Sequence, residues 1–531
     1  AVGEQTVALE CKFSDLTPVS AILTLDALHK PAECGSTSPA YNMRLADLLP
    51  PELDCPPGAE SIELATVTAD SRSVTPGALF AALPGTRVDG TRFVPDAIEK
   101  GAAAILVPSE ATLPPDISVP VIRAPDARRA LALMAARMYP GQPETAVAVT
   151  GTNGKTSVVE FTRQIFAALG RRAASLGTIG VVKPDGALYG ALTTPDPVAL
   201  HKMLAELADE GVTHLAFEAS SHGLDQRRVD GVQITAAAFT NLGRDHLDYH
   251  PSVEDYFSAK LRLFEVLLPP GRPAVINADD PRAEAVEAAA RRRNQQIVSV
   301  GRAGKTLTLE GVEPEGFGQR LRIRHNGTLY EVRLPLIGAY QASNALVAAG
   351  LAIATGEDPK AAIESIAALR GVNGRLDVVG QTEDGLVVVD YAHKPEALEA
   401  ALLALRPFAK GRLICVFGCG GDRDRGKRPI MGRIAVTRAD VVIVTDDNPR
   451  SEDPAAIRAE ILADAPGAIE IGDRRAAIQA AIDMMQPGDL VLVAGKGHET
   501  GQIVGETVIP FSDHDAVREA LAHRSSTRTT S

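Results

Sequence analysis

The stretch that most constrains the fold of this chain lies between residues 145 and 169. The apolar run Thr145–Thr150 predicts a buried strand, and the residues from Ser157 to Leu169 predict a helix that ends before Gly170. Between them lies the glycine-rich turn Gly-Thr-Asn-Gly-Lys-Thr. This combination favours a phosphate site, because backbone N–H groups and the helix N-terminus would face the anion.

We expect the turn to hold the phosphates of a nucleotide triphosphate. Lys155 would contact the terminal phosphates, and the Thr156 hydroxyl would reach a Mg²⁺ ion. Val149 stands where longer loops of this kind have a glycine, so the loop is a compact variant. The residues expected to form it are Gly151, Thr152, Asn153, Gly154, Lys155, Thr156 and Ser157.

A second copy of the compact pattern, Gly-Arg-Ala-Gly-Lys-Thr, occupies residues 301–306. It is followed by Leu307–Gly311, an alternating run that predicts a strand and not a helix. Without a helix N-terminus the anion site is not built. We therefore expect a turn between strands at this second copy.

Composition excludes several classes of protein. The chain has 531 residues, too many for one core, and a net charge of −13 that argues against general affinity for nucleic acid or an anionic membrane. Its five cysteines form no C-x-x-C pair, which indicates free thiols in a reducing cytoplasm. No transmembrane run or secretory signal is apparent, so we expect a cytoplasmic protein without membrane insertion.

The chain divides into segments of different character. Residues 1–41 connect to no later motif and are expected to be a dispensable extension, with Met43 as a candidate translation start; deleting them should leave activity intact. We expect an α/β domain at 43–143, a second at 144–372, a third at 373–522 with a doubly wound sheet, and a flexible tail at 523–531. Met43–Leu49 and Ala127–Met138 predict helices.

Polar residues follow the predicted strands of the second domain. Glu218 ends the apolar strand 213–218, where a Mg²⁺ ligand belongs beside a phosphate loop. Arg-Asp-His-Leu-Asp-Tyr-His at 244–250 follows another apolar strand, and Lys260 reads as an ordinary surface lysine of a helix. Taken singly, each of these residues also fits a solvated loop or helix surface.

Chemistry-bearing residues of the third domain gather where its predicted strands end. The strands are expected at 386–390, 413–417, 441–445 and 490–494, and ligands of open α/β sheets bind at the carboxyl edge. The motifs that follow them are Asp-Tyr-Ala-His-Lys-Pro, Gly-Cys-Gly-Gly-Asp-Arg-Asp-Arg, Asp-Asp-Asn-Pro-Arg and Gly-Lys-Gly-His-Glu.

Taken in order, these motifs make the chain resemble the Mur ligase family, over residues 43–522. The nearest branch adds meso-diaminopimelate to UDP-N-acetylmuramoyl-L-alanyl-D-glutamate in peptidoglycan precursor synthesis. The resemblance implies three domains: a UDP-muramoyl-binding one, a central P-loop ATPase α/β one and a C-terminal Rossmann-like doubly wound one. It also implies an ATP-dependent amide ligase that works through an acyl phosphate, with small-molecule substrates and a monomeric state.

The resemblance further assigns the catalytic and nucleotide residues. Lys155, His246 and Lys260 are expected to be catalytic, with ATP and Mg²⁺ as cofactors. Thr156, Glu218, His246 and Lys260 match the metal sites, with Lys260 as a carbamylated lysine (N6-carboxylysine) whose added carboxylate can ligate a cation. Further ATP contacts are expected from Asn277, Arg375, Asp390, Tyr391 and His393. Gln341 departs from the family, which more often has Asn there.

Two sets of residues match the other substrates. UDP-muramoyl-dipeptide contacts are expected from Ser71, Thr86, Arg87, Val88, Thr193, Thr194, Ser220, Gln226 and Arg228. Diaminopimelate contacts are expected from Arg423, Asp447, Asn448, Pro449, Arg450, Gly495 and Glu499. Arg450 offers a bidentate partner to the distal carboxylate that diaminopimelate has and lysine lacks.

Four other functions compete with this one. The same ligase with L-lysine is disfavoured by Asp-Asn-Pro-Arg, and a folylpolyglutamate synthase by the first domain and the third-domain motifs. A P-loop motor or switch predicts ATP hydrolysis without dependence on an amine. A non-enzymatic binding module has no use for paired metal ligands.

Overall fold

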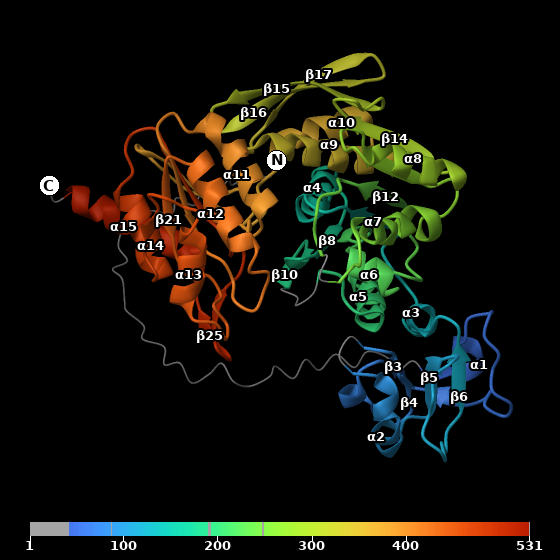
Figure 1. The fold of residues 1–531 in the computed structure, drawn as a ribbon. Helices are drawn as coiled ribbons and strands as arrows, with labels where there is room; N and C mark the ends of the chain where they lie inside the picture. Colours follow the sequence, from blue (N-terminus) through green and yellow to red (C-terminus); the bar gives the residue numbers. More distant parts are fainter. Residues whose placement is uncertain (1–41, 86–87, 189–192, 247–248, 530–531) are drawn as a thin grey trace, which may run out of the picture. The chain divides into compact units, whose positions relative to one another are not determined.

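The computed structural model describes residues 42–85, 88–188, 193–246 and 249–529. The expected extension at 1–41 lies outside this part of the chain, as do Thr86 and Arg87 of the expected UDP-binding loop. Three larger sheets are present, each inside one of the expected domains (Figure 1).

The first sheet is parallel and belongs to the N-terminal segment. Its described strands, in spatial order, are β3 (Thr66–Thr68), β4 (Ala78–Ala81), β5 (Ala104–Pro108) and β6 (Val121–Ala124). Helices α1 (Leu45–Leu48) and α3 (Ala127–Met138) pack on one face, and α2 (Val94–Glu99) packs on the other. A short antiparallel pair, β1 (Met43–Arg44) and β2 (Glu63–Leu64), lies beside α1.

The central sheet runs in the order β10-β9-β8-β11-β7-β12-β13-β14-β15-β16-β17 over the described residues. Strands β8, β11, β7, β12, β13, β14 and β15 are parallel, and antiparallel strands extend both edges. The strand bounds are β7 (Thr145–Thr150), β8 (Ala173–Gly177), β9 (Gly180–Lys183), β10 (Gly186–Leu188), β11 (His214–Glu218), β12 (Ala236–Phe239), β13 (Pro273–Asn277), β14 (Gln296–Gly301), β15 (Leu307–Glu315), β16 (Gly318–His325) and β17 (Thr328–Leu334).

Helices cover both faces of this sheet. Val147 and Val149 of β7 pack with α4 and α9, whereas Ala146 and Ala148 pack with α5, α7 and α8, as the twofold repeat of a strand requires. The helices are α4 (Lys155–Ala168), α5 (Pro197–Asp209), α6 (Ser221–Asp225), α7 (Val253–Arg262), α8 (Ala283–Arg292), α9 (Ala339–Ala354) and α10 (Pro359–Glu364).

The third sheet has the order β18-β19-β23-β20-β21-β22 in the described chain. Alternate residues of its strands pack on α11 to α13 and on α14 with α15, which gives a doubly wound domain (orange to red in Figure 1). The bounds are β18 (Asp377–Thr382), β19 (Gly385–Asp390), β20 (Leu413–Phe417), β21 (Val441–Val444), β22 (Ile469–Glu470), β23 (Asp489–Ala494), α11 (Pro395–Leu405), α12 (Lys427–Arg438), α13 (Pro454–Leu462), α14 (Arg474–Asp483) and α15 (Asp513–Thr529). A hairpin, β24 (Gly501–Val504) and β25 (Thr507–Pro510), follows β23.

Most elements match the predictions, and the differences have local causes. The second copy of the loop pattern is confirmed as a turn, between β14 and β15. Helix α4 begins at Lys155, two residues before the predicted start, and Met43–Arg44 is strand where a helix was predicted. The tail predicted to be flexible is helical as far as Thr529.

The helical tail is fixed by tertiary contacts. The Arg524 guanidinium donates hydrogen bonds of 2.7 Å to the Asp384 carboxylate and to the carbonyl of Met485. These contacts join α15 to the residue before β19 and to the turn after α14. The polar sequence of the tail gives no sign of such distant contacts. No helix in the described part of the chain is long and apolar enough to cross a membrane.

Candidate active site

The phosphate loop connects β7 to α4, and its two glycines are required by close packing. Gly151 has φ of 148°, and a Cβ there would lie 1.9 Å from the Thr240 Oγ1. Gly154 has φ of 84°, and a Cβ would lie 2.4 Å from the Asn344 Oδ1. Only glycine tolerates both this backbone and this crowding.

The two residues that follow the neighbouring strand β12 fix the conformation of the loop. The amide N–H of Thr152 donates to the carbonyl of Asn241 at 2.8 Å, and that of Asn153 donates to the Asn241 Oδ1 at 2.9 Å. The Thr240 hydroxyl donates to the carbonyl of Asn153 at 2.7 Å. Thr240 and Asn241 are therefore part of the site, although the sequence motifs did not single them out.

Two lysines meet at this loop. Nζ of Lys155 donates to the carbonyls of Gly151 and Thr152 at 2.9 and 3.0 Å, and Nζ of Lys260 donates to the same Gly151 carbonyl at 2.7 Å. Lys260 is 1% exposed, so it is not the surface residue that its helix suggested. Burial and the nearby Lys155 ammonium hold the pKa of Lys260 well below its ordinary value, which favours the neutral amine.

Glu218 lies at the end of β11, beside the start of α4. The Thr156 hydroxyl donates to its Oε1 at 2.8 Å, and the Thr178 amide N–H donates to the same oxygen at 2.8 Å. Glu218 is 1% exposed. A hydroxyl and a buried carboxylate beside a phosphate loop are oxygen donors of the kind that Mg²⁺ takes, so these residues fit that ion.

His246 completes the set expected at the metal. Burial lowers the pKa of His246 to about 4, so its imidazole is neutral at pH 7 and can act as a ligand. Its ring lies 6.0 Å from that of Tyr256, and Nζ of Lys260 lies 4.2 Å from the centre of the same Tyr256 ring. Across the described residues no three His, Cys, Asp or Glu side chains gather as a metal site, so the set depends also on Thr156 and Lys260.

The expected dipeptide residues of the central domain form one connected group. The Thr194 hydroxyl donates to the carbonyl of Glu218 at 2.9 Å and shares a hydrogen bond of 3.0 Å with Ser220. Arg228 donates to the carbonyl of Thr194 at 2.7 Å and to the Gln226 Oε1 at 2.7 Å. The structure thus brings these side chains next to the Glu218 carboxylate, and Thr193 joins them through a 3.1 Å hydrogen bond with Thr178.

Ser71 and Val88 belong to the N-terminal segment. Lys100 donates to the carbonyl of Ser71 at 3.0 Å, and Val88 is 44% exposed. With Thr86 and Arg87 outside the described residues, the expected UDP loop is only partly visible.

The expected nucleotide residues fall into two groups. Asn277 ends β13 and donates to the carbonyl of Thr240 at 2.8 Å, which ties it to the phosphate loop. In the third domain, the Arg375 guanidinium stacks 4.6 Å from the Tyr391 ring. Asp390 accepts from the amides of residues 376 and 392 at 2.7 and 2.8 Å, and the His393 ring lies 4.6 Å from that of Tyr391.

The residues expected to bind the amine meet at the carboxyl ends of β21 and β23. Asn448 donates to the Glu499 Oε2 at 3.0 Å, and a Cβ at Gly495 (φ 122°) would lie 3.1 Å from the Asp447 Oδ2. Asp447 is buried, and its Oδ1 has no hydrogen-bond partner among the described residues. An orphaned buried carboxylate oxygen is a ready acceptor for an ammonium group.

The three remaining residues of the expected set lie on the loops that follow β20 and β21. Arg450 has φ of 51° and donates to the carbonyl of Gly421 at 2.9 Å. Pro449 is buried beside it, and its carbonyl accepts from the amide of Glu452 at 3.1 Å. Arg423 is exposed and donates to the carbonyl of Asp422 at 2.9 Å.

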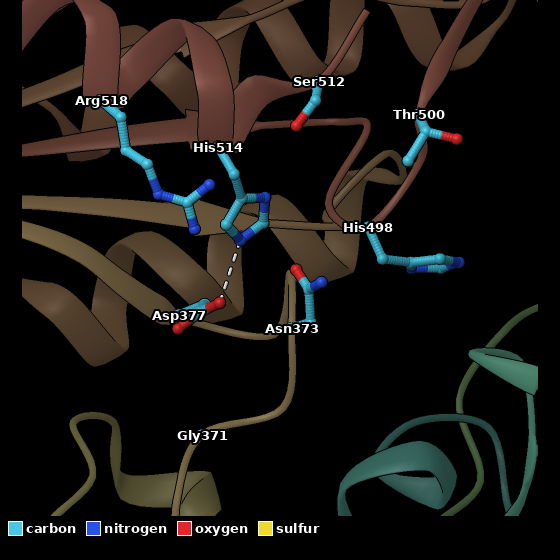
Figure 2. A pocket seen from close by; sticks show the side chains of 8 residues that line it. All are labelled: Gly371, Asn373, Asp377, His498, Thr500, Ser512, His514 and Arg518. Atoms are coloured by element: carbon cyan, nitrogen blue, oxygen red, sulfur yellow. Dashed lines mark hydrogen bonds and ion pairs between the residues drawn. The ribbon is translucent and has the colours of Figure 1, made fainter. Parts of the chain in front are cut away.

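A separate polar pocket of about 340 Å³ lies between β18, the loop after β23 and the start of α15. Figure 2 shows its central contact, a 2.9 Å interaction between His514 and Asp377. None of the expected site residues lines it. Its lining residues are Gly371, Asn373, Asp377, His498, Thr500, Ser512, His514 and Arg518.

Comparison with known proteins shows the family of this chain. Three family models match the chain: Mur ligase family, catalytic domain (residues 63–139), Mur ligase middle domain (149–352) and Mur ligase, glutamate ligase domain (374–497). A relative from Agrobacterium fabrum, named UDP-N-acetylmuramoyl-L-alanyl-D-glutamate–2,6-diaminopimelate ligase, is 57% identical over 87% of this chain and 94% of its own length. This chain belongs to the Mur ligase family.

Solved structures extend the likeness of this Mur ligase to the fold. One entitled as the structure of a UDP-N-acetylmuramoyl-L-alanyl-D-glutamate–2,6-diaminopimelate ligase has a TM-score of 0.68 and 33% identity. It covers 91% of this chain and 99% of that chain. A Mycobacterium tuberculosis folylpolyglutamate synthase complexed with ADP and AMPPCP shares the fold, with a TM-score of 0.56 and 20% identity over 69% of this chain and 92% of its own.

Gln341, the departure from the Mur ligase pattern, has a defined place. Its Nε2 donates to the carbonyl of Arg375 at 3.3 Å, and its Oε1 accepts from Asn344 at 3.0 Å. Since Asn344 also packs against Gly154, Gln341 connects a residue in contact with the phosphate loop to the backbone of Arg375, an expected nucleotide contact.

Two further residues of this Mur ligase site escaped the sequence analysis. Thr178 contacts Glu218, but no local motif marks it. Lys496 is fully buried against Asn448 and Glu499, and its place in the Gly-Lys-Gly-His-Glu motif was the available signal.

Proposed function

We propose that this Mur ligase joins meso-diaminopimelate to UDP-N-acetylmuramoyl-L-alanyl-D-glutamate, with ATP as the energy source, in peptidoglycan precursor synthesis. The 57% identical relative carries that name. The observation that carries the proposal joins two residues of the loop that follows β21. The Oδ1 of Asp447 is buried and accepts no hydrogen bond, and three residues later the Arg450 guanidinium donates to the carbonyls of Gly421 and Asn448. Together they offer an anion to an ammonium group and a cation to a carboxylate.

The first half of the reaction activates a carboxylate. The terminal phosphoryl group of ATP passes to the D-glutamate side-chain carboxylate, which gives an acyl phosphate and ADP. Two anions must approach one another in this step, so cations have to neutralise the phosphates. Lys155 at the start of α4 supplies one positive charge, and Mg²⁺, when bound, supplies two more.

The second half forms the amide. The neutral amine of diaminopimelate attacks the acyl carbon, the C–O bond to phosphate breaks, and inorganic phosphate leaves while the nitrogen loses a proton. The position of the amine therefore decides the rate. Asp447 and Glu499 would hold the other ammonium group of the amino acid, and Arg450 would hold the distal carboxylate. The remaining contacts with diaminopimelate would come from Gly495, Asn448, Pro449 and Arg423.

The metal would be held by Thr156, Glu218, His246 and a carbamylated Lys260. Carbamylation needs a neutral amine: its nitrogen bonds to the carbon of CO₂, and one proton leaves to solvent. Burial and Lys155 keep the Lys260 amine in that neutral form. The product carries a negative charge, so it attracts the Lys155 ammonium group and offers oxygens to Mg²⁺.

The remaining substrate contacts follow the same proposal. The dipeptide would be held beside Glu218 by Thr193, Thr194, Ser220, Gln226 and Arg228. The uridine end would be held by Ser71 and residues 86–88. Asn277, Arg375, Asp390, Tyr391 and His393 would bind the nucleotide. We further propose a cytoplasmic monomer; the described cysteines Cys55, Cys415 and Cys419 are free thiols.

The test is an ADP-release assay on the full-length chain. ADP should form only when the UDP-dipeptide and an amino acid are both present, and diaminopimelate should act at concentrations where L-lysine does not. ADP formation without any amine would favour a P-loop ATPase instead. Activity with a folate and glutamate would favour a folylpolyglutamate synthase, whose fold is similar.

A further inference from the structure

Lys496 lies among the residues proposed to bind the amine, and its side chain is 0% exposed. It follows β23 and precedes Glu499 by three residues. A lysine is almost never fully buried unless its charge is paired. The partners that it contacts therefore indicate what it does.

The ammonium group of Lys496 has three N–H donors and no acceptor. It lies 3.1 Å from the Asn448 Oδ1 and 3.2 Å from the Glu499 Oε2, both within hydrogen-bond range. The Asp447 Oδ1 is 3.7 Å away, which is close enough for an ion pair and too far for a hydrogen bond. All three partners belong to the proposed amine pocket.

These contacts fix the orientation of the Asn448 amide. Its Oδ1 accepts from Lys496 and also from the amide N–H of Ile503 at 2.9 Å. The Nδ2 must therefore face the Glu499 carboxylate, where it donates at 3.0 Å. The reversed amide would set NH₂ against an ammonium group and a backbone N–H, leaving three donors without an acceptor.

The same cation sets the charge of the pocket. Where the substrate ammonium group would bind, Asp447 and Glu499 bring two negative charges and Lys496 cancels one, which leaves a single negative charge. The positive charge of Arg450 is counted separately, because Arg450 would bind the substrate carboxylate. Burial raises the pKa of Asp447, and the Arg474 and Lys496 cations oppose that rise. Because Lys496 stays beyond hydrogen-bond range, the Asp447 Oδ1 remains available to a ligand.

We propose that Lys496 is a positioning residue for the amine substrate: it orients Asn448 and Glu499 and leaves one net negative charge where the substrate ammonium group would bind. This inference rests on the proposed function, since it takes Asp447, Asn448 and Glu499 as amine-binding residues. Lys496 itself is walled off from solvent and would not touch the amino acid.

The test compares the Michaelis constants of the three substrates in K496M, which keeps an unbranched apolar side chain as far as Cε and removes the ammonium group. The KM for diaminopimelate should rise about tenfold or more, as expected when a charged partner of a buried polar network is lost. The KM values for ATP and the UDP-dipeptide should stay within about twofold of wild type, and kcat should fall less than KM rises.

Arg412→Met is the matched control. It removes a 2.6 Å ion pair with Asp489, which lies where β20 and β23 begin. The proposed amine residues lie at the other, carboxyl edge of this sheet, so the control weakens the sheet away from them. It should lower the melting temperature and leave all three KM values unchanged. If K496M behaves like this control, or moves the three KM values together, Lys496 is only structural and the proposal is overturned.

Two further arms keep the test decisive. If K496M does not fold, the same comparison is made with K496R. Its displaced charge should raise the KM for diaminopimelate and leave the other two KM values unchanged. A KM for diaminopimelate equal to that of the wild type would overturn the proposal. The wild-type assay tests the proposed function separately. If the wild type prefers another amino acid, the same comparison is made with that substrate, and a selective rise in its KM still supports the role of Lys496.

Discussion

Nζ of Lys260 donates a 2.7 Å hydrogen bond to the carbonyl of Gly151, so the carbamylation candidate touches the first residue of the phosphate loop. A carbamate at this buried site would keep one N–H on Nζ and add a charged group that can ligate a metal. We predict that K260R, whose guanidinium cannot be carbamylated, loses at least about a hundredfold in kcat, as removal of a catalytic charge commonly does.

The carbamate itself can be detected by ¹³C NMR after equilibration with ¹³C-bicarbonate. The wild type should show a carbamate signal that is absent from K260R. Lys202→Arg is the control, because Lys202 is half exposed on α5 and should change neither activity nor the signal. Full activity in K260R would contradict the role of Lys260.

Gly154 and Gly170 form a matched pair at the two ends of α4. Both have φ near 80°, so alanine is strained equally at each, but a Cβ meets the Asn344 Oδ1 at 2.4 Å only at Gly154. Gly170→Ala should cost about 1–2 kcal/mol of stability and leave nucleotide affinity unchanged. Gly154→Ala should lose more stability than Gly170→Ala and should also bind ATP more weakly, as measured by calorimetry. If the two variants bound ATP with equal affinity, the packing described at Gly154 would be contradicted.

Arg474 and Arg475 are neighbours on α14 with opposite environments. Arg474 makes a bidentate pair with Asp513, both 0% exposed, at 2.7 and 2.8 Å, whereas Arg475 pairs with Glu519 on the surface. Arg474→Met should destabilise the third domain by about 3–5 kcal/mol, because it strands a buried carboxylate. Arg475→Met should cost less than about 1 kcal/mol in the same urea titration. Similar losses would mean that the buried pair is not formed.

Acid should weaken the fold through His393. Burial, helped by the Lys394 and Lys427 ammonium groups, lowers the pKa of His393 to about 3. The contribution of neutral His393 to the free energy of unfolding is therefore fully present above pH 6.5. It is lost as the pH falls from 6.5 towards 3, because in this range only the unfolded chain binds the proton.

This loss amounts to about 1.4 kcal/mol per pH unit within the window. His393→Asn can still donate to the carbonyl of Tyr391 and does not titrate, so it should lose less stability than wild type between pH 6.5 and 4.5. Urea midpoints at both pH values measure the difference. Parallel losses in the two proteins would show that His393 is not responsible.

The sequence predicted those parts of the fold that local patterns determine. The strand Thr145–Thr150 was predicted with its observed bounds, since a continuous apolar run meets a glycine turn. The start of α4 at Lys155 was missed because the left-handed Gly154 ends the loop without a side-chain cap. The helical tail was missed because the contacts of Arg524 are with residues far away in the sequence.

The candidate site divides in the same way. Residues that carry a recognisable motif, such as Lys155, Glu218 and Asp447, could be named from the sequence. Thr178 and Asn241 could not, because each acts through contacts with a neighbouring strand or loop and their local sequence resembles any turn. The burial of Lys260 was equally invisible, since the helix pattern indicated an exposed lysine.

The most direct test of the account is a competition experiment. The full-length chain is incubated with ATP, the UDP-dipeptide and an equimolar mixture of meso-diaminopimelate and L-lysine, and the products are separated by mass spectrometry. Arg450→Ala is run beside the wild type, with Arg433→Ala, at an exposed arginine on α12, as the control. We predict almost exclusively the diaminopimelate product from wild type and Arg433→Ala, and a loss of that preference in Arg450→Ala. A wild type that forms mainly the lysine product, or neither, would contradict the central claim.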